Sequence, residues 1–87
     1  MTDKCTYPIV IYREETSDGT LWIGNFPGLN GCWAEGASEQ EVISRASGVL
    51  RQYADACREM EWQIPEAPTV KELEAANVGK VTLITEA

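Results

Sequence analysis

The chain has 87 residues, of which 44% are hydrophobic, and a formal net charge of −7, so it can fold as one small domain with a modest core. The excess of acidic residues argues against direct binding to nucleic acid, which is bound through cations, and favours a basic partner. No apolar run approaches the length of a membrane span, and the polar N-terminus predicts no signal peptide.

Short apolar segments in the N-terminal part of the chain predict three strands. Residues 7–14 are rich in β-branched and aromatic side chains, which is typical of a strand. Residues 15–20 then form a hairpin connection, in which Asp18-Gly19 can adopt positive φ. Residues 21–26 form the second strand, and after a Pro/Gly-rich crossing residues 32–35 form a short third strand.

A long amphipathic helix follows the third strand. Ser38 and Glu41 have the spacing of a capping box, in which each side chain accepts a hydrogen bond from the other residue's backbone N–H. The helix is predicted to end near Glu61, before Pro65. Its apolar face consists of Val42, Ala46, Val49, Leu50, Tyr53, Cys57 and Met60.

The C-terminal part of the chain predicts a connector, a short helix and a strand. Residues 62–68 form a Pro-rich extended connector, residues 69–76 the short helix, and residues 80–85 the final strand. We predict a single domain over residues 1–87, with a βββα core over residues 6–61. The fold class is α+β: a two-layer β-β-β-α-β arrangement in which one long helix covers one face of an antiparallel sheet.

The first two strands carry apolar residues on both of their faces. In the first strand the alternating residues are Tyr7, Ile9 and Ile11 on one face and Val10 and Tyr12 on the other. One helix covers only one face of a small sheet, so we expect the second face to be buried as well. The covering is either a second copy of the chain or a partner protein, or the chain's own residues 69–84.

The sequence lacks the residues of common catalytic and metal sites. It contains no His, and Cys5, Cys32 and Cys57 do not have the spacing of zinc ligands. Cys32 fits a small core residue better than a nucleophile. Reduced thiols are typical of a cytosolic protein, so we expect a cytoplasmic location. We expect no cofactor and no bound metal.

A metal-dependent ribonuclease is the enzyme class that a sheet with one helix could carry. Such a site requires a carboxylate in the middle of the first strand, facing others on the helix and on a neighbouring strand. Ile9, Val10 and Ile11 occupy that position, and Asp55 lies away from the apolar face of the helix. The pattern favours a binding protein over an enzyme, and Glu35 and Asp55 are the acids through which magnesium-dependent cleavage would be tested.

Several segments together resemble the HicB family, the antitoxin partner in bacterial HicBA toxin–antitoxin pairs. The resembling segments are Tyr7–Ile11 and Trp22–Phe26 for two strands, Phe26-Pro27 with Gly31-Cys32 for the crossing, Gly36–Ser38 with Glu41 for the helix start, and Ile64–Pro68 for the Pro-rich exit. The resemblance covers most of residues 7–68. It implies a partial ribonuclease-H-like fold without the nuclease acids, dimers or higher oligomers, and binding to a small basic ribonuclease, HicA, whose active site uses a His.

Two departures from the family pattern affect the expected function. Gly28 stands where the family commonly carries an acid, and Asn30 where it commonly carries Pro. Many members also append a promoter-binding domain, for which a chain ending at Ala87 leaves no room, so we expect no direct binding to DNA.

The sequence therefore predicts an antitoxin that neutralises a HicA-type toxin by protein–protein contact. The alternative is a stand-alone homo-oligomeric structural or regulatory domain without a toxin partner. Acids at strand ends and aromatic anchors suit contact with a cationic surface. The candidate contact residues are Glu14, Glu15, Asp18, Trp22, Trp33 and Glu35.

Overall fold

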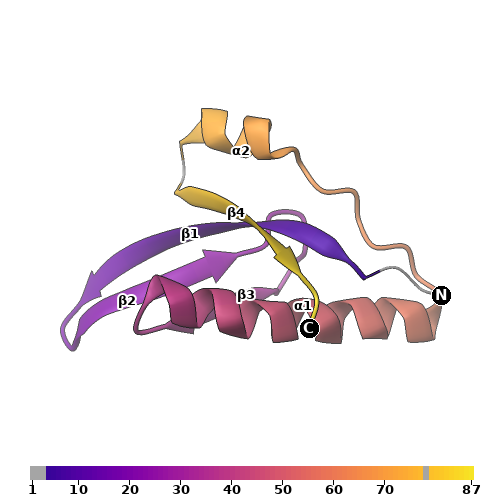
Figure 1. Ribbon diagram of the computed structural model, residues 1–87, viewed down its shortest axis with the longest axis horizontal. Coiled ribbons are helices and arrows are strands. Elements are labelled where there is room, and N and C mark those ends of the chain that lie inside the picture. The colour runs from indigo at the N-terminus through magenta and orange to yellow at the C-terminus, as the bar shows by residue number, and fades with distance from the viewer. Residues whose placement is uncertain (1–3, 78) are drawn as a thin grey trace.

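The computed structural model describes residues 4–77 and 79–87. Its elements are, in chain order, β1 (Thr6–Thr16), β2 (Gly19–Asn25), β3 (Trp33–Gly36), α1 (Glu39–Met60), α2 (Val70–Ala76) and β4 (Lys80–Thr85) (Figure 1). The strands form one antiparallel sheet in the order β3-β2-β1-β4, so the C-terminal strand lies beside the first. One long helix, α1, covers one face of this sheet, which confirms the predicted α+β fold.

The hairpin between β1 and β2 is tighter than predicted. The two strands pair as far as Thr16 and Gly19, which leaves Ser17 and Asp18 as the turn. Gly19 has φ of +124°, a conformation that glycine adopts without a steric penalty. The Thr16 hydroxyl donates a hydrogen bond to the Gly19 carbonyl (2.7 Å), which closes the turn.

The start of α1 is fixed by a side-chain cap. The Ser38 hydroxyl accepts a hydrogen bond from the Glu41 N–H (3.1 Å), as the capping box predicts. The Glu41 carboxylate forms an ion pair with Arg45 (2.7 Å) in place of the predicted bond back to Ser38. The helix thus begins where expected, but only half of the capping box forms.

The core lies between α1 and one face of the sheet. It consists of Tyr7, Ile9, Ile11, Phe26, Leu29, Cys32, Ala34, Val42, Ala46, Leu50 and Ile84. The helix face differs from the predicted one at its C-terminal end. Met60 is 56% exposed, because the last turn of α1 extends beyond the strands (Figure 1), whereas Ala54 is fully buried and was not predicted.

Gly24 allows α1 to approach the sheet closely. A Cβ atom at this position would lie 2.6 Å from both Ile9 Cδ1 and Val42 Cγ1, and both of these side chains are fully buried. Real Cβ atoms do not come this close to other carbons, so any side chain here would push the helix away from the sheet.

We expect Gly24→Ala to lower the free energy of unfolding by about 1–3 kcal/mol, because the added methyl group overpacks the core. Gly48→Ala is the matched control: it lies inside α1, nothing would meet its Cβ within 4 Å, and it should raise stability by about 1 kcal/mol through helix propensity. Urea unfolding of both variants measures the two effects. Equal stability of the two variants would contradict the close approach.

Gly28, in the crossing between β2 and β3, explains one departure from the HicB pattern. It has φ of +91°, and a Cβ atom there would lie 2.8 Å from the buried Tyr7 hydroxyl. The acid that the family commonly carries at this position therefore does not fit the conformation of this chain.

The C-terminal residues are tied to β1 and to α1. The carboxylate of Glu86, which is only 7% exposed, accepts hydrogen bonds from Arg58 Nη1 (2.8 Å), from Arg58 Nη2 (2.7 Å) and from the Cys5 N–H (2.7 Å). The Glu86 N–H donates to the Cys5 carbonyl (2.9 Å). The hydrogen bonds from Arg58 lower the pKa of the Glu86 carboxyl group. These contacts hold β4 beside β1 and fasten both strands to the helix.

Because the pKa of Glu86 is lower in the folded state, the ionised carboxylate adds stability above its unfolded pKa, and this stability is lost as pH falls through the folded pKa. Glu86→Gln should therefore lower the melting temperature at neutral pH, and the difference from the unmodified chain should shrink below about pH 4.3. Thermal unfolding followed by circular dichroism at a series of pH values measures this difference. Glu59→Gln, an exposed acid on α1, changes the net charge equally and should change the melting temperature little. A difference for Glu86→Gln that does not vary with pH would show that the carboxylate does not act through its ionisation.

Candidate partner-binding surface

The side of the sheet opposite α1, which we call the outer face, carries apolar side chains from all four strands. Side chains alternate between the two faces, and directly opposed residues share a face. The register places Tyr12, Ile23 and Glu35 in one row across the sheet. The apolar and acidic residues of the outer face are Pro8, Val10, Tyr12, Glu14, Leu21, Ile23, Trp33, Glu35, Val81 and Leu83.

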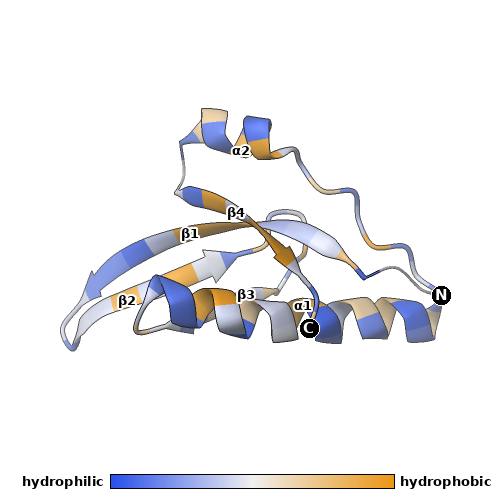
Figure 2. Cartoon of the chain, viewed as in Figure 1, coloured by the Kyte–Doolittle hydropathy of each residue, from blue (hydrophilic) through white to orange (hydrophobic). Residues whose placement is uncertain are grey.

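The outer face is covered at one end and open over the rest. Val10 is 5% exposed, and the C-terminal segment lies against it, because a Cβ on Gly79 would be 2.9 Å from Val10 Cγ1. Figure 1 shows α2, which contacts β4, on the side of that strand away from α1. By contrast, Tyr12, Trp33 and Leu83 are 41%, 52% and 59% exposed. The chain's own C-terminal segment thus covers only part of this face. Figure 2 shows the hydrophobic residues along the strands.

The predicted acidic contact residues lie in three different places. Glu14 and Glu35 are on the outer face, where both are exposed. Glu15 is on the opposite side, where its carboxylate accepts a hydrogen bond from the Thr20 hydroxyl (3.0 Å). Asp18 lies in the turn between β1 and β2. The outer face therefore combines exposed apolar side chains with two of the four predicted acids.

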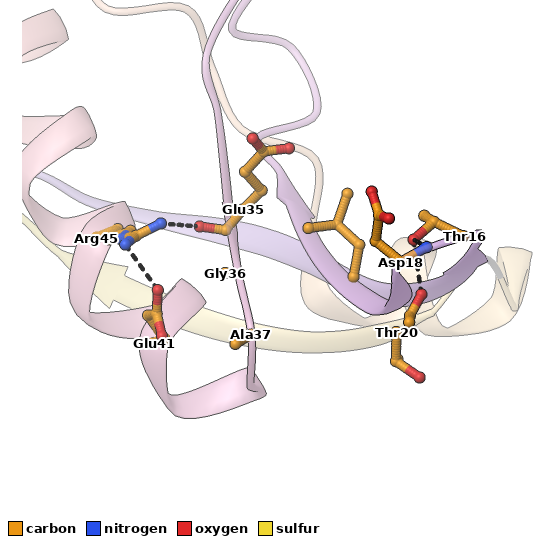
Figure 3. A pocket seen from close by; sticks show the side chains of 10 residues that line it. Thr16, Asp18, Thr20, Glu35, Gly36, Ala37, Glu41 and Arg45 are labelled. Carbon is orange, nitrogen blue, oxygen red and sulfur yellow. Dashed lines mark hydrogen bonds and ion pairs between the residues drawn. The ribbon is translucent and has the colours of Figure 1, made fainter.

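An open groove of about 500 Å³ lies at the hairpin end of the sheet, and it brings Asp18 and Glu35 together (Figure 3). Arg45 is one of the lining residues, and it donates a hydrogen bond to the Glu35 carbonyl (2.8 Å) and pairs with Glu41 (2.7 Å). Figure 3 shows the Glu35 and Asp18 carboxylates directed away from this ion pair. The groove is lined by both apolar and polar surface, and the Asp18 and Glu35 carboxylates extend the negative charge of the outer face toward the turn.

The two predicted aromatic contact residues lie on opposite faces of the sheet. Trp22 is opposite Arg13 and Gly36 on the α1 side, where it is half-buried and packs against the core. Trp33 is half-exposed on the outer face. Of the two, Trp33 alone stands among the exposed side chains of the outer face.

The sequence-based list of contact residues omitted Tyr12 and Leu83, which are among the most exposed apolar side chains of the sheet. The alternation in β1 already separated Tyr12 from the core residues Ile9 and Ile11, so this signal was present in the sequence. The sequence did not mark Leu83 as exposed. Its six-residue strand has apolar residues at both odd and even positions, so alternation does not show which of its sides α1 covers.

The cysteines belong to the packed interior rather than to a reactive site. Cys32 and Cys57 are buried and Cys5 is half-buried, and all three are free thiols. Burial raises the pKa of the Cys32 thiol, and burial together with the nearby Glu86 carboxylate raises that of Cys5. A raised pKa disfavours the nucleophilic thiolate.

The acid on α1 that a nuclease site would need is engaged elsewhere. Asp55 pairs with Arg58 (3.1 Å) and with Arg51 (3.6 Å) on the helix surface. Within residues 4–77 and 79–87, no three Asp, Glu, Cys or His side chains are grouped closely enough to hold a metal ion. No helix in the described part of the chain combines the length and apolar character needed to cross a membrane.

Comparison with solved structures places this fold beside that of a toxin–antitoxin assembly. A chain of the HicA3 and HicB3 toxin–antitoxin complex superimposes with a TM-score of 0.60 at 20% sequence identity, covering 95% of this chain and 99% of that one. No family model and no curated protein sequence matches the chain. The likeness establishes a shared fold over nearly the whole length of both chains.

Proposed function

We propose that this chain is the antitoxin of a HicBA-type pair, binding a small basic HicA-type toxin through the outer face and blocking its cleavage of mRNA by protein contact alone. The observation that carries the proposal is an exposed apolar sheet face beside carboxylates that have no internal partner. The likeness to a chain of a toxin–antitoxin complex supports it independently.

The distribution of ion pairs supports a cationic partner. On the helix, Glu41 pairs with Arg45, and Glu39 pairs with Lys80 (2.5 Å). Among the residues that the structure describes, Glu14 and Glu35 make no ion pair. The outer face therefore carries two carboxylates that no ion pair within the described residues neutralises, and these raise the encounter rate with a basic protein and help to orient it.

Apolar anchoring provides the second part of the proposed contact. Trp33 and Tyr12 present large, half-exposed rings on the same face, and aromatic residues of this kind are the commonest dominant contacts at protein interfaces. Ile23, which is opposite Tyr12 on one side and Glu35 on the other, is half-buried and adds to the apolar surface of this face. A toxin surface that carries Lys or Arg around an apolar contact matches this arrangement in charge and in polarity.

The proposed role needs no catalysis and no cofactor from this chain. A HicA-type ribonuclease binds RNA through cations, and a partner that occupies the cationic surface excludes the RNA phosphates from it. We propose that this masking neutralises the toxin, and that the chain itself is not an enzyme.

The test uses a small basic protein that the proposal expects to be encoded beside this gene. We expect the two purified proteins to form a complex that weakens as salt is raised, and the chain to suppress RNA cleavage by its neighbour. The double variant Glu14→Lys with Glu35→Lys should weaken binding at least about tenfold. Glu59→Lys with Glu61→Lys makes the same change in net charge at the far end of α1 and serves as the control. Separate elution at low salt together with unaffected RNA cleavage would refute the antitoxin role.

The same purified proteins also distinguish the antitoxin role from two other functions. A homo-oligomeric domain that buries its outer face against a second copy would place Glu14 and Glu35 near the same acids of that copy, which makes this arrangement less favourable. A metal-dependent ribonuclease would show magnesium-dependent cleavage by the chain alone, lost in Glu35→Gln or Asp55→Asn. Since Asp55 is paired with arginines, we do not favour that activity.

A further inference from the structure

Residues 63–77, which we call the cover segment, run from the end of α1 toward β4 and contain α2. The hydrogen bonds that this segment forms with described residues all lie within it. The Glu72 N–H donates to the Thr69 hydroxyl (3.1 Å), and the N–H groups of Leu73 and Asn77 donate to carbonyls of the same segment. None of its charged side chains forms an ion pair with a described residue. The cover segment is therefore attached to the rest of the domain by apolar contacts alone.

The apolar contacts of the cover segment are small. α2 has no buried residue, and it contacts β4. Ile64 and Ala67 are only half-buried against the core, and Val70 and Leu73 of α2 are half-buried as well. A helix of this length is not stable in isolation, so α2 depends on these contacts to stay folded. Segments with few buried contacts open at a lower free energy than the core, and the cover segment is of this kind.

Both ends of the cover segment are joined to firmly held parts of the domain. Before it, the Trp62 N–H donates to the Cys57 carbonyl (2.8 Å) at the end of α1. After it, β4 is paired with β1 along its whole length, and the Glu86 carboxylate is held by Arg58. The cover segment can therefore leave the sheet while α1 and β4 keep their places.

The cover segment lies over one end of the outer face. Figure 1 shows α2 on the side of β4 that is away from α1. On this side Pro8 and Val10 are buried, whereas Tyr12, further along the same face of β1, is half-exposed. These three residues form one continuous strip, because alternate residues of a strand share a face. Displacement of α2 would lengthen the open apolar strip toward Pro8.

A buried hydroxyl beside the cover segment favours its opening. Tyr7 is buried, and its hydroxyl forms no hydrogen bond with a described residue. Pro68 of the cover segment lies at the same point, because a Cβ on Gly28 would be 2.8 Å from Tyr7 Oη and 3.9 Å from Pro68 Cδ. Burial of a hydroxyl without a partner costs free energy, which is recovered when water reaches the group. The closed position of the cover segment therefore carries a cost that the open position does not.

We propose that the cover segment opens as a unit, and that the bound toxin takes its place on the strip of β1 from Tyr12 to Pro8. The occupant rests on the proposed function, whereas the opening is a property of the free chain. The strip is apolar and continuous with the outer face that carries Glu14 and Glu35, so one basic partner with an apolar contact matches both. A partner that binds only the open form has its affinity reduced by the fraction of chains that are open. The cover segment thus sets how tightly the outer face binds the toxin.

The first test uses the free chain and hydrogen exchange followed by NMR. We expect the amides of Leu73 and Glu74 in α2 to exchange at least about 100-fold faster than the amide of Ile84 in β4, and low concentrations of urea should change the α2 rates little, because local opening exposes little surface. Ile84 is the reference because it is paired with Tyr7 of β1. Exchange of α2 and β4 at one rate, with one dependence on urea, would show that they open together and overturns the proposal.

A second measurement on the free chain removes the buried hydroxyl. Tyr7→Phe should slow exchange of the α2 amides at least about threefold, because the closed position no longer buries a hydroxyl without a partner. Tyr53→Phe is the control: Tyr53 is half-buried on α1, and its change should leave exchange in α2 as it is. Equal α2 exchange in Tyr7→Phe and in the unmodified chain contradicts a segment that closes over this hydroxyl.

The third test measures toxin affinity by calorimetric titration. Leu73→Gln weakens the apolar contact of α2 and should raise the affinity at least about threefold, because the open fraction rises. Ala75→Gln, at an exposed position of the same helix, should leave the affinity unchanged. Unchanged or weaker binding by Leu73→Gln overturns the proposal, since the segment would then be inert or itself part of the contact. If no toxin binds the unmodified chain, the proposed function fails, and the exchange data still decide whether the cover segment opens.

Discussion

Replacing Leu50 with alanine should lower the free energy of unfolding by about 2–5 kcal/mol, a large share of the stability of a domain of this size. Leu50 is fully buried in the middle of α1, at the centre of the contact between the helix and the sheet. Its truncation removes apolar contacts and leaves a cavity that the flanking strands fill only in part, since β1 and β2 are fixed by their ladders on both sides.

Urea unfolding followed by tryptophan fluorescence measures this loss. Val49→Ala is the control, because Val49 is adjacent in sequence but only half-buried, so it should lose clearly less. A loss below about 1 kcal/mol for Leu50→Ala would mean that the packed face of α1 is assigned wrongly.

Trp33→Ala should weaken binding of the basic toxin at least about 30-fold, which corresponds to roughly 2 kcal/mol. The ring is 52% exposed on the outer face in the free chain, so most of its apolar surface is available to be buried by a partner. For the same reason, the substitution should change the free energy of unfolding by less than about 1 kcal/mol. Binding and stability are thus expected to separate at this residue.

Trp62→Ala provides the matched control for the loss of an indole ring. Trp62 is 63% exposed just after α1, away from the outer face, and its removal should leave toxin affinity unchanged. Calorimetric titration of both variants against the toxin compares them directly. If Trp33→Ala binds as tightly as the unmodified chain while Trp62→Ala does not, the partner surface lies at the end of the helix and the proposed face is wrong.

The helix and its start could be predicted because their signals are local. Ser38 caps the helix from three residues away, and apolar residues recur at helical spacing from Val42 to Cys57. Met60 shows where this reasoning ends. The helical spacing of apolar residues continues to the last turn of α1, but the sheet does not extend beneath that turn. The Met60 side chain is therefore exposed.

The candidate surface could be predicted in part. Alternation in β1 assigned Val10 and Tyr12 to the face opposite Ile9, and this face is the outer one. The placement of Trp22 against the core and of Trp33 in the open depends on which face α1 covers and on the register of β3, neither of which is encoded within a strand. Sequence reasoning therefore grouped both tryptophans as contact candidates.

The sequence by itself determined the strands, the helix and the excess of negative charge, because propensity, side-chain periodicity and capping act over a few neighbouring residues. The tertiary structure alone decided that β4 lies beside β1, with Thr6 and Thr85 in contact across 79 positions of sequence, and that Glu86 is held by Arg58. Such pairings depend on the packing of the whole domain, since many strand partners are locally equivalent and only burial of the common core selects among them. The same selection left part of the outer face open.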